Sequence, residues 1–162
     1  MPTWGIVLIC VGGVFVFLVL LAIAIPTFLG VKDSANDRVA QSNLNTALIN
    51  GRAIYADNGN NFTGVSLTSL QQSMPFFNVV GPTTPVTSEN TISVGVAPQA
   101  IVFTARSTTG HCWYVLYVAE ASSALNPRLP QAPGVYYGTT DSSVCESAEL
   151  PRHWSTDMFP QP

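Results

Sequence analysis

The histidines and cysteines of this sequence are the side chains best suited to metal binding or nucleophilic chemistry. His111 stands next to Cys112, and His153 is distant from both. Neighbouring residues on a strand point to opposite faces, so His111 and Cys112 are poorly placed to bind one ion, and no ligand set has zinc spacing. We expect no metal site, no cofactor and no enzymatic activity. Glu146 and Glu149 are interpreted as solvated loop residues.

The cysteines allow one bridge outside the apolar part of the chain. Cys10 lies within an apolar run, which leaves Cys112 and Cys145 as a pair. In an oxidising compartment their bridge would close a loop of about 34 residues and stabilise the fold by roughly 3 to 4 kcal/mol. A cytosolic protein would instead carry two unrelated reduced thiols. A membrane-tethered ectodomain favours the bridge.

Charge and glycine spacing argue against nucleic acids and nucleotides as ligands. Charged residues make up 9% of the 162 residues and the net charge is −3. The arginines are scattered, whereas nucleic-acid grooves need clustered cations. The glycines form neither a phosphate loop nor a dinucleotide fingerprint. We therefore expect no nucleic-acid partner.

The first part of the chain is the element around which the rest is organised. It carries no charged residue before Lys32, and Ile6–Ile25 is an apolar run. As a helix, twenty residues span about 30 Å, the thickness of a bilayer core. We predict a transmembrane or filament-core segment at residues 1–30. A removable secretory signal and a buried core helix are the alternatives, but the first needs basic residues and a shorter core, and the second is rarely apolar on every face.

Gly12, Gly13 and Pro26 are weak points of this predicted helix. Glycine costs backbone entropy, and proline removes a helical hydrogen bond. One interpretation is that membrane helices simply tolerate such residues. The other is that the helix kinks or melts between them when it packs among copies of itself.

The next segment, 31–58, has helical spacing of its apolar residues and is predicted to continue the helix without a loop. A stop is predicted at Asp57-Asn58-Gly59, where Asn58 or Gly59 can adopt the left-handed cap. The stripe predicted to face a partner surface is Val31, Ala35, Val39, Leu44, Ala47, Leu48, Gly51, Ile54 and Tyr55. The polar face predicted opposite it is Asp33, Asp37, Arg38, Gln41, Asn45 and Arg52.

The remainder, 31–162, is predicted to be one head domain of class α+β. Residues 59–90 form a connecting loop, interrupted by prolines, with one or two helical turns at 66–73. An antiparallel sheet follows in the region 91–162, because alternation and β-branched or aromatic residues favour strands there. The four predicted strands are 91–97, 100–106, 111–119 and 134–139.

Two patches resemble a known family. The segment Ala22–Leu48, AIAIPTFLGVKDSANDRVAQSNLNTAL, is similar to the first helix of type IV pilins and type II secretion pseudopilins, most of all those of actinobacteria. GHCWYVLYV at Gly110–Val118, GVYYG at Gly134–Gly138, Cys145 and Trp154 look like the carboxy-terminal half of the same proteins.

The resemblance implies a type IV pilin fold, with a long N-terminal helix packed on a small antiparallel sheet and a Cys112–Cys145 disulfide fastening the last loop. It also implies a structural subunit of a pilus or pseudopilus, whose head lies outside the membrane. The implied partners are like or related subunits, the membrane, an assembly platform with its ATPase and, if the chain is processed, a prepilin peptidase.

Two features differ from the family pattern. Prepilins carry a basic leader cut after glycine, and Gly5-Ile6 is the position that fits such a cut, yet no Lys or Arg precedes it. The family also places a glutamate within the apolar run, where this sequence has Ile9 and Cys10. Lys32 and Arg38 follow the run, so the positive-inside rule alone would orient the head inward.

A non-polymerising single-pass ectodomain, acting as a binding or scaffold protein, is the alternative function.

Overall fold

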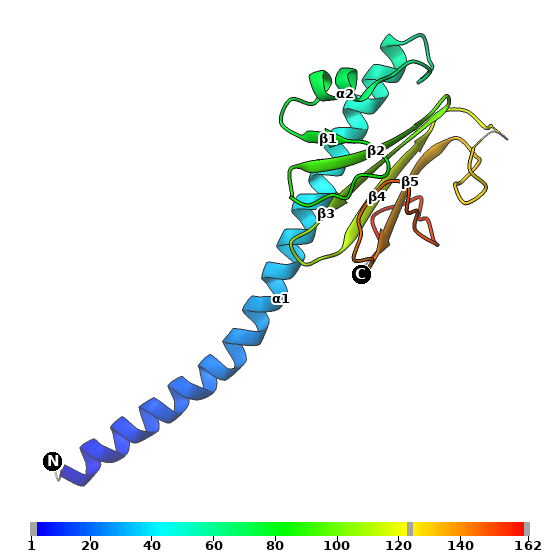
Figure 1. The fold of residues 1–162 in the computed structure, drawn as a ribbon. Coiled ribbons are helices and arrows are strands. Elements are labelled where there is room, and N and C mark those ends of the chain that lie inside the picture. The colour runs from blue at the N-terminus through cyan, green and yellow to red at the C-terminus, as the bar shows by residue number, and fades with distance from the viewer. Residues whose placement is uncertain (1–2, 123–124, 161–162) are drawn as a thin grey trace. The chain divides into compact units, whose positions relative to one another are not determined.

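The computed structural model describes residues 3–122 and 125–160, and within the first helix the side chains of residues 4–5, 10–22 and 33–57. The fold class is α+β, with a five-stranded mixed sheet. The chain divides into two compact units, Met1–Ala35 and Asn36–Pro162. The second unit, which we call the head, contains the sheet (Figure 1).

Helix α1 spans Thr3–Asp57. It ends where the sequence predicts, because Gly59 adopts a positive φ of 68° and Asn60 one of 59°. The amide of Asn58 still donates to the Ile54 carbonyl at 2.9 Å, and the Asn60 amide donates to the Tyr55 carbonyl at 2.9 Å. A left-handed residue after the last turn is the usual way to satisfy these terminal carbonyls.

The sheet has the order β1-β2-β3-β4-β5. Its strands are β1 (Asn78–Val80), β2 (Thr91–Ala97), β3 (Ala100–Arg106), β4 (Cys112–Val118) and β5 (Gly134–Thr140). The pairings β2–β3, β3–β4 and β4–β5 are antiparallel, which confirms the predicted meander.

Strand β1 corrects the prediction of a purely antiparallel sheet that follows a loop. It pairs in parallel with β2, with Val79 opposite Ile92. Three residues between Pro75 and Pro82 are too few to show a strand pattern in the sequence. At the other edge, β5 is extended by one bridge, in which Tyr137 and Ser155 exchange two hydrogen bonds of 2.8 Å.

Helix α2 (Leu67–Ser73) occupies the segment where helical turns are predicted. Ser66 is its N-cap, and the Ser69 amide donates to the Ser66 hydroxyl at 3.1 Å. The Ser69 hydroxyl in turn accepts from the Ser66 amide at 3.0 Å, which completes a capping box. Leu70 is the buried residue through which α2 joins the core.

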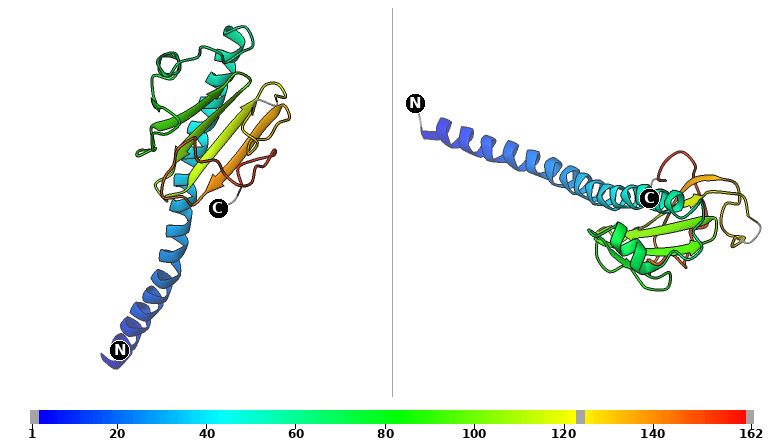
Figure 2. Two further views of the ribbon diagram at one scale, coloured as in Figure 1. Left: turned by 45° about the vertical axis from the view of Figure 1, so that its right-hand side comes forward. Right: turned by 90° about the horizontal axis from the view of Figure 1, so that it is seen from above.

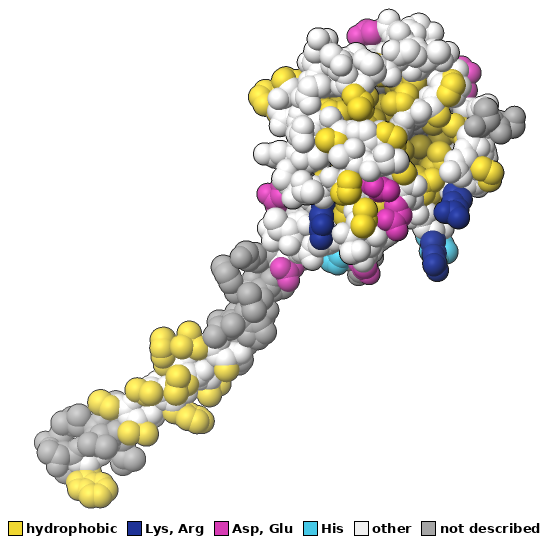
Figure 3. Space-filling view, in the orientation of Figure 1, with side chains coloured by type: hydrophobic (Ala, Val, Ile, Leu, Met, Phe, Trp, Pro, Cys, Tyr) yellow, Lys and Arg dark blue, Asp and Glu magenta, His cyan; other side chains and the backbone are white. Residues whose placement is uncertain are grey.

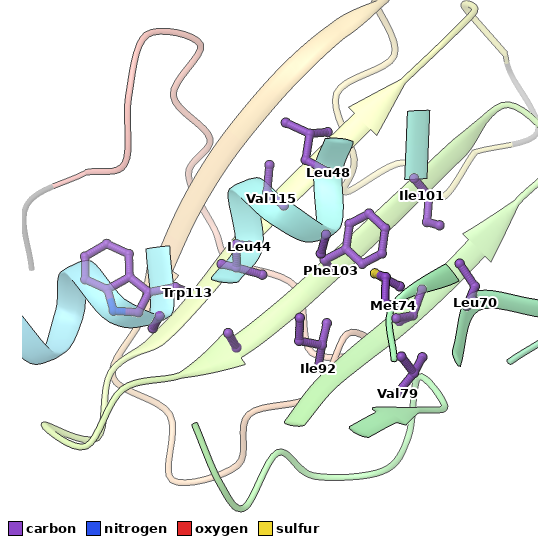
Figure 4. Close-up of a cluster of buried hydrophobic side chains, with 14 of the residues drawn as sticks. Leu44, Leu48, Leu70, Met74, Val79, Ile92, Ile101, Phe103, Trp113 and Val115 are labelled. Atoms are coloured by element: carbon purple, nitrogen blue, oxygen red, sulfur yellow. The ribbon is translucent and has the colours of Figure 1, made fainter. Parts of the chain in front are cut away.

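One face of the sheet, which we call the inner face, packs against residues 36–57 of α1 (Figures 2 and 4). Leu44 and Leu48 from the helix meet Phe103, Trp113 and Val115 from the strands in one buried cluster. The helix approaches closely at Gly51, where an added Cβ would lie 2.8 Å from the Phe103 ring.

The buried stripe of α1 matches the predicted one from Leu44 to Tyr55 and departs from it at residues 35–41. Asp37 and Gln41, predicted on the polar face, are both buried with 7% of their surface exposed. Val39, predicted on the packed stripe, is 45% exposed, and Ala35 is also exposed. The correction has a physical cause, because Asp37 finds hydrogen-bond donors on β4 and on the turn before it, as described below.

The opposite or outer face of the sheet is covered by loops. Ala100, Val102, Tyr114 and Leu116 form a second buried cluster with the two paired cysteines. The disulfide between Cys112 and Cys145 is present, with a Cα–Cα distance of 5.4 Å. Beside it the Val86 amide donates to the Cys145 carbonyl at 2.7 Å. The bond therefore fastens the last loop to β4.

Candidate functional site

The apolar half of α1 is the first candidate, because the side chains that the structure describes at 10–22 are all exposed. Every large side chain from Val11 to Leu21 is exposed, from 39% at Leu21 to 67% at Phe15. Consecutive residues on a helix point in all directions, so no face of this segment is polar. Among the residues that the structure describes, no helix combines the length and apolarity needed to cross a bilayer.

The residues predicted for processing and kinking lie along this helix. Gly5, Gly12 and Gly13 are within α1, and an added Cβ at any of them would meet nothing within 4 Å. The side chains of Ile6 and Pro26 lie outside the described residues. Cleavage at Gly5-Ile6 and melting between Gly12 and Pro26 therefore stay predictions.

The exposed face of α1 within the head is the second candidate, and we call it the outer stripe. Its members recur at alternating spacings of three and four residues, which is the seam pattern of packed helices. All are exposed and none is charged: Val39, Ser42, Thr46, Ile49, Ala53 and Ala56. The Thr46 hydroxyl donates to the Ser42 carbonyl at 3.1 Å, so this polar group is satisfied within the helix.

Two neighbouring cations have partners of their own, and one of them, Arg38, lines a hollow together with Ser42 of the outer stripe. The Arg52 guanidinium lies 4.9 Å from the centroid of the Tyr117 ring, on the sheet side. Arg38 donates to the Gln41 side chain at 3.1 Å. A surface helix usually carries charges on its solvent face. The outer stripe is instead an uncharged surface with Ile49, 68% exposed, at its centre.

A buried carboxylate is the third candidate. The Thr109 hydroxyl donates to Asp37 at 2.6 Å, and the Trp113 indole N–H donates at 3.3 Å. His111 Nδ1 lies 3.3 Å from both carboxylate oxygens, and its Nε2 lies 3.6 Å from exposed Asp141. This cluster joins the start of the head's helix to β4 and to the turn before it.

Hydrogen bonding decides the charge of that carboxylate. Burial alone would raise the pKa of Asp37, but donation from Thr109, Ser107, His111 and Trp113 outweighs it and lowers the pKa below the usual 3.8. The ionised form is therefore the one that the fold stabilises. The arrangement can hold α1 on the sheet.

The sequence reasoning missed this cluster for a physical reason. Asp37 lies 72 to 76 residues before its partners, so no local pattern connects them. The sequence offered one sign of its burial: Asp37 lies three positions before the apolar Ala40, and residues at this spacing share a face of a helix. Helical spacing identifies residue types on a face and does not identify distant donors.

The histidines and cysteines are separated as their strand positions require. His111 faces Asp37 on the inner side, whereas Cys112 is disulfide-bonded on the outer side. His153 is exposed. Within 3–122 and 125–160, no group of three or more His, Cys, Asp and Glu side chains could hold a metal ion.

Comparison with known proteins adds no relative from which a role could be taken. The family models, the curated proteins and the solved structures that were searched contain no match to this chain.

Proposed function

We propose that this chain is a structural, pilin-like subunit of a type IV pilus or a type II secretion pseudopilus, which polymerises through α1 and carries its head outside the membrane. The observation that carries the proposal is the uncovered apolar segment from Val11 to Leu21. An apolar surface of this extent is costly in water and calls for lipid or other helices around it.

The same segment is suited to moving between two apolar surroundings. Lipid tails and the interior of a helix bundle are about equally apolar, so transfer between them changes solvation little. Association then depends on the packing of helices. Small residues such as Gly12 and Gly13, which meet nothing within this chain, allow close approach of neighbouring helices.

The outer stripe supports the proposal from within the head. Its uncharged residues follow the spacing of a packed seam, and the head's own core does not cover them. The similarity of Ala22–Leu48 to pilin helices supports the same function.

A second candidate is a single-pass, membrane-anchored ectodomain that binds or scaffolds a partner without polymerising. The observation in its favour is the absence of any acidic residue between Ile6 and Ile25. In pilins a glutamate there pairs with a neighbouring subunit's amino terminus and helps to set register. Without it, one source of subunit alignment is missing.

Filament formation by the full-length chain tests the two candidates against each other. Cells producing the chain are sheared, the released material is imaged by electron microscopy, and the membrane fraction is analysed by mass spectrometry. The proposal expects sheared filaments that contain this chain. The variant Ile49→Lys should lower filament yield by about tenfold or more, because it places a charge within a packed seam.

The matched control is Asn45→Lys, which adds the same charge to an exposed position of α1 outside the outer stripe. It should leave filament yield within about twofold of the unmodified chain. A chain that stays monomeric in the membrane, with an intact Met1 and no filaments, would overturn polymerisation and favour the anchored ectodomain.

A further inference from the structure

The outer face of the sheet contains an apolar hollow of about 230 Å³. Its lining includes no charged residue, whereas three other hollows on the head each contain at least one cation and one carboxylate. Figure 3 views the head from this side and shows apolar side chains gathered on the surface. The hollow is therefore chemically distinct from its surroundings.

Small side chains form the floor of the hollow. Gly95, Ala97 and Ala100 lie where β2 and β3 pair, and an added Cβ at Gly95 would come within 2.9 Å of Val102. Leucines from two loops are also in the lining, namely Leu125, Leu129 and Leu150. Because the floor consists of small residues and the leucines stand at the sides, the hollow has room for an apolar side chain of another molecule.

The same chain presents an aromatic ring that has no partner of its own. Phe76 is 89% exposed, more than any other large apolar residue described in the structure. It stands in a turn closed by donation from the Phe77 amide to the Met74 carbonyl at 3.1 Å. Pro75 precedes it, and proline fixes the backbone at such turn positions.

A half-buried glutamine holds that turn in place. The Gln71 amide nitrogen donates to the Phe77 carbonyl at 2.6 Å, and its oxygen accepts from the Val79 amide at 2.9 Å. Met74, beside Phe76, is buried with 2% exposure. The ring is thus displayed on a fixed support, so little conformational entropy would be lost when it binds.

Size and charge both match the ring to the hollow. A dry cavity of about 150 Å³ accommodates benzene, so 230 Å³ is sufficient for a phenyl group. The chain carries no charged residue from Asn58 to Ser88, so the segment around Phe76 brings no charge of its own to the hollow. Its exposure shows that Phe76 does not occupy the hollow of its own chain.

We propose that Phe76 of one copy docks into the apolar hollow of a second copy. This inference rests on the proposed function, since it needs subunits held side by side. A knob and a hollow on different parts of one surface make a heterologous contact, which leaves a free knob and a free hollow at the two ends. Such a contact repeats from subunit to subunit.

Site-specific photo-crosslinking in membranes tests the contact on the full-length chain. Benzoylphenylalanine replaces Phe76, and irradiated dimers are digested and sequenced by mass spectrometry. The expected adduct joins position 76 to a peptide containing Leu125, Leu129 or Leu150 of another copy. The variant Leu129→Glu should reduce its yield by about tenfold, because it places a charge at the hollow.

Two controls keep the result interpretable. The same photo-crosslinker at Thr68, exposed on α2, should give no adduct that Leu129→Glu abolishes. Phe76→Ser changes an exposed side chain and should leave the core intact. It should therefore weaken crosslinking between heads by reagents that react with carboxylates. This readout remains valid even if Leu129→Glu unfolds its own loop. Retention of the Cys112–Cys145 bond reports folding.

Adducts to lipid, to another protein or to the same chain would overturn the contact, as would adducts that Leu129→Glu leaves unchanged. Filaments that form through α1 without the adduct would show that this contact is wrong while the proposed function stands. If no oligomer of any kind forms, the proposed function and the contact both fail.

Discussion

The two faces of the sheet are completed in different ways. Helix α1 covers most of the inner face and α2 adds to it through Leu70, and here Trp113 and Tyr55 both find hydrogen-bond partners for their polar atoms. Loops and one disulfide cover the outer face. Among the described residues, the buried side-chain polar atoms without a partner belong to Thr104, Tyr114 and Trp154, and all three lie toward the outer face.

This difference separates stability from interaction. A covering helix supplies its own backbone hydrogen bonds and can pack continuously, so the inner face is a complete core. Loops cover a sheet less evenly, and on the outer face they leave the hollow above β2 and β3. The inner face therefore sets the stability of the head, and the outer face is the one with unused apolar surface.

The largest expected effect comes from breaking the inner face at Phe103, which is fully buried against Gly51. Phe103→Ala should lower the free energy of unfolding by roughly 3 to 5 kcal/mol, because it removes apolar contacts and leaves a cavity. Denaturant unfolding of the full chain in detergent measures it. The control Ile49→Ala alters an exposed residue of α1 and should stay within about 0.5 kcal/mol.

Opening the outer face at the disulfide should cost somewhat less. The bond joins residues separated by 33 positions, and its removal in Cys112→Ser with Cys145→Ser should cost roughly 3 to 4 kcal/mol. Hydrogen exchange should show that the backbone amides of the segment following β5 lose protection, while the amides of β3 keep theirs. Cys10→Ser is the control. Equal loss of protection on both faces would contradict the contrast between them.

The Asp37 cluster gives the inner face a dependence on pH. The folded pKa of Asp37 lies below its unfolded value, so its stabilisation is complete above about pH 3.8 and is lost as the pH falls through the lowered pKa. Asp37→Asn should cost roughly 1.5 to 3 kcal/mol at neutral pH and flatten that acid limb. Thermal unfolding between pH 2 and 6 compares the two chains, and an unchanged acid limb would refute the assignment.

The smallest effect should have the opposite sign. Burial raises the pKa of Tyr114 to about 12 against a smaller lowering by the nearby Thr140 hydroxyl, and the buried Tyr114 hydroxyl makes no hydrogen bond of good geometry. Tyr114→Phe removes that group and should be neutral or stabilising by up to about 1 kcal/mol. Trp113→Phe, its neighbour on the inner face, deletes a donor to Asp37 and should destabilise. Destabilisation by Tyr114→Phe would indicate a hidden partner.

The parts of the fold that depend on local pattern could be predicted from the sequence. The strands 91–97 and 100–106 were predicted at the residues where β2 and β3 lie, because alternation and turn residues mark them. The end of α1 follows from Asn58 and Gly59, which favour a left-handed cap.

The parts that depend on distant partners could not be predicted from it. Asp37 was assigned to solvent because its donors, Thr109 and Trp113, are brought to it only by the fold. The short β1 exists because β2 offers it a neighbour. The disulfide was one of two alternatives for Cys112 and Cys145, and compartment rather than spacing separated them.

The edges of the sheet also limit how copies of this head can associate. One edge of the sheet is β1, which has three residues and lies between Pro75 and Pro82. At the other edge, the Tyr137–Ser155 bridge occupies part of β5. Short and partly capped edges are poor templates for an incoming strand. Strand pairing between crowded heads is therefore disfavoured, and an ordered array of heads would rely instead on contacts between side chains.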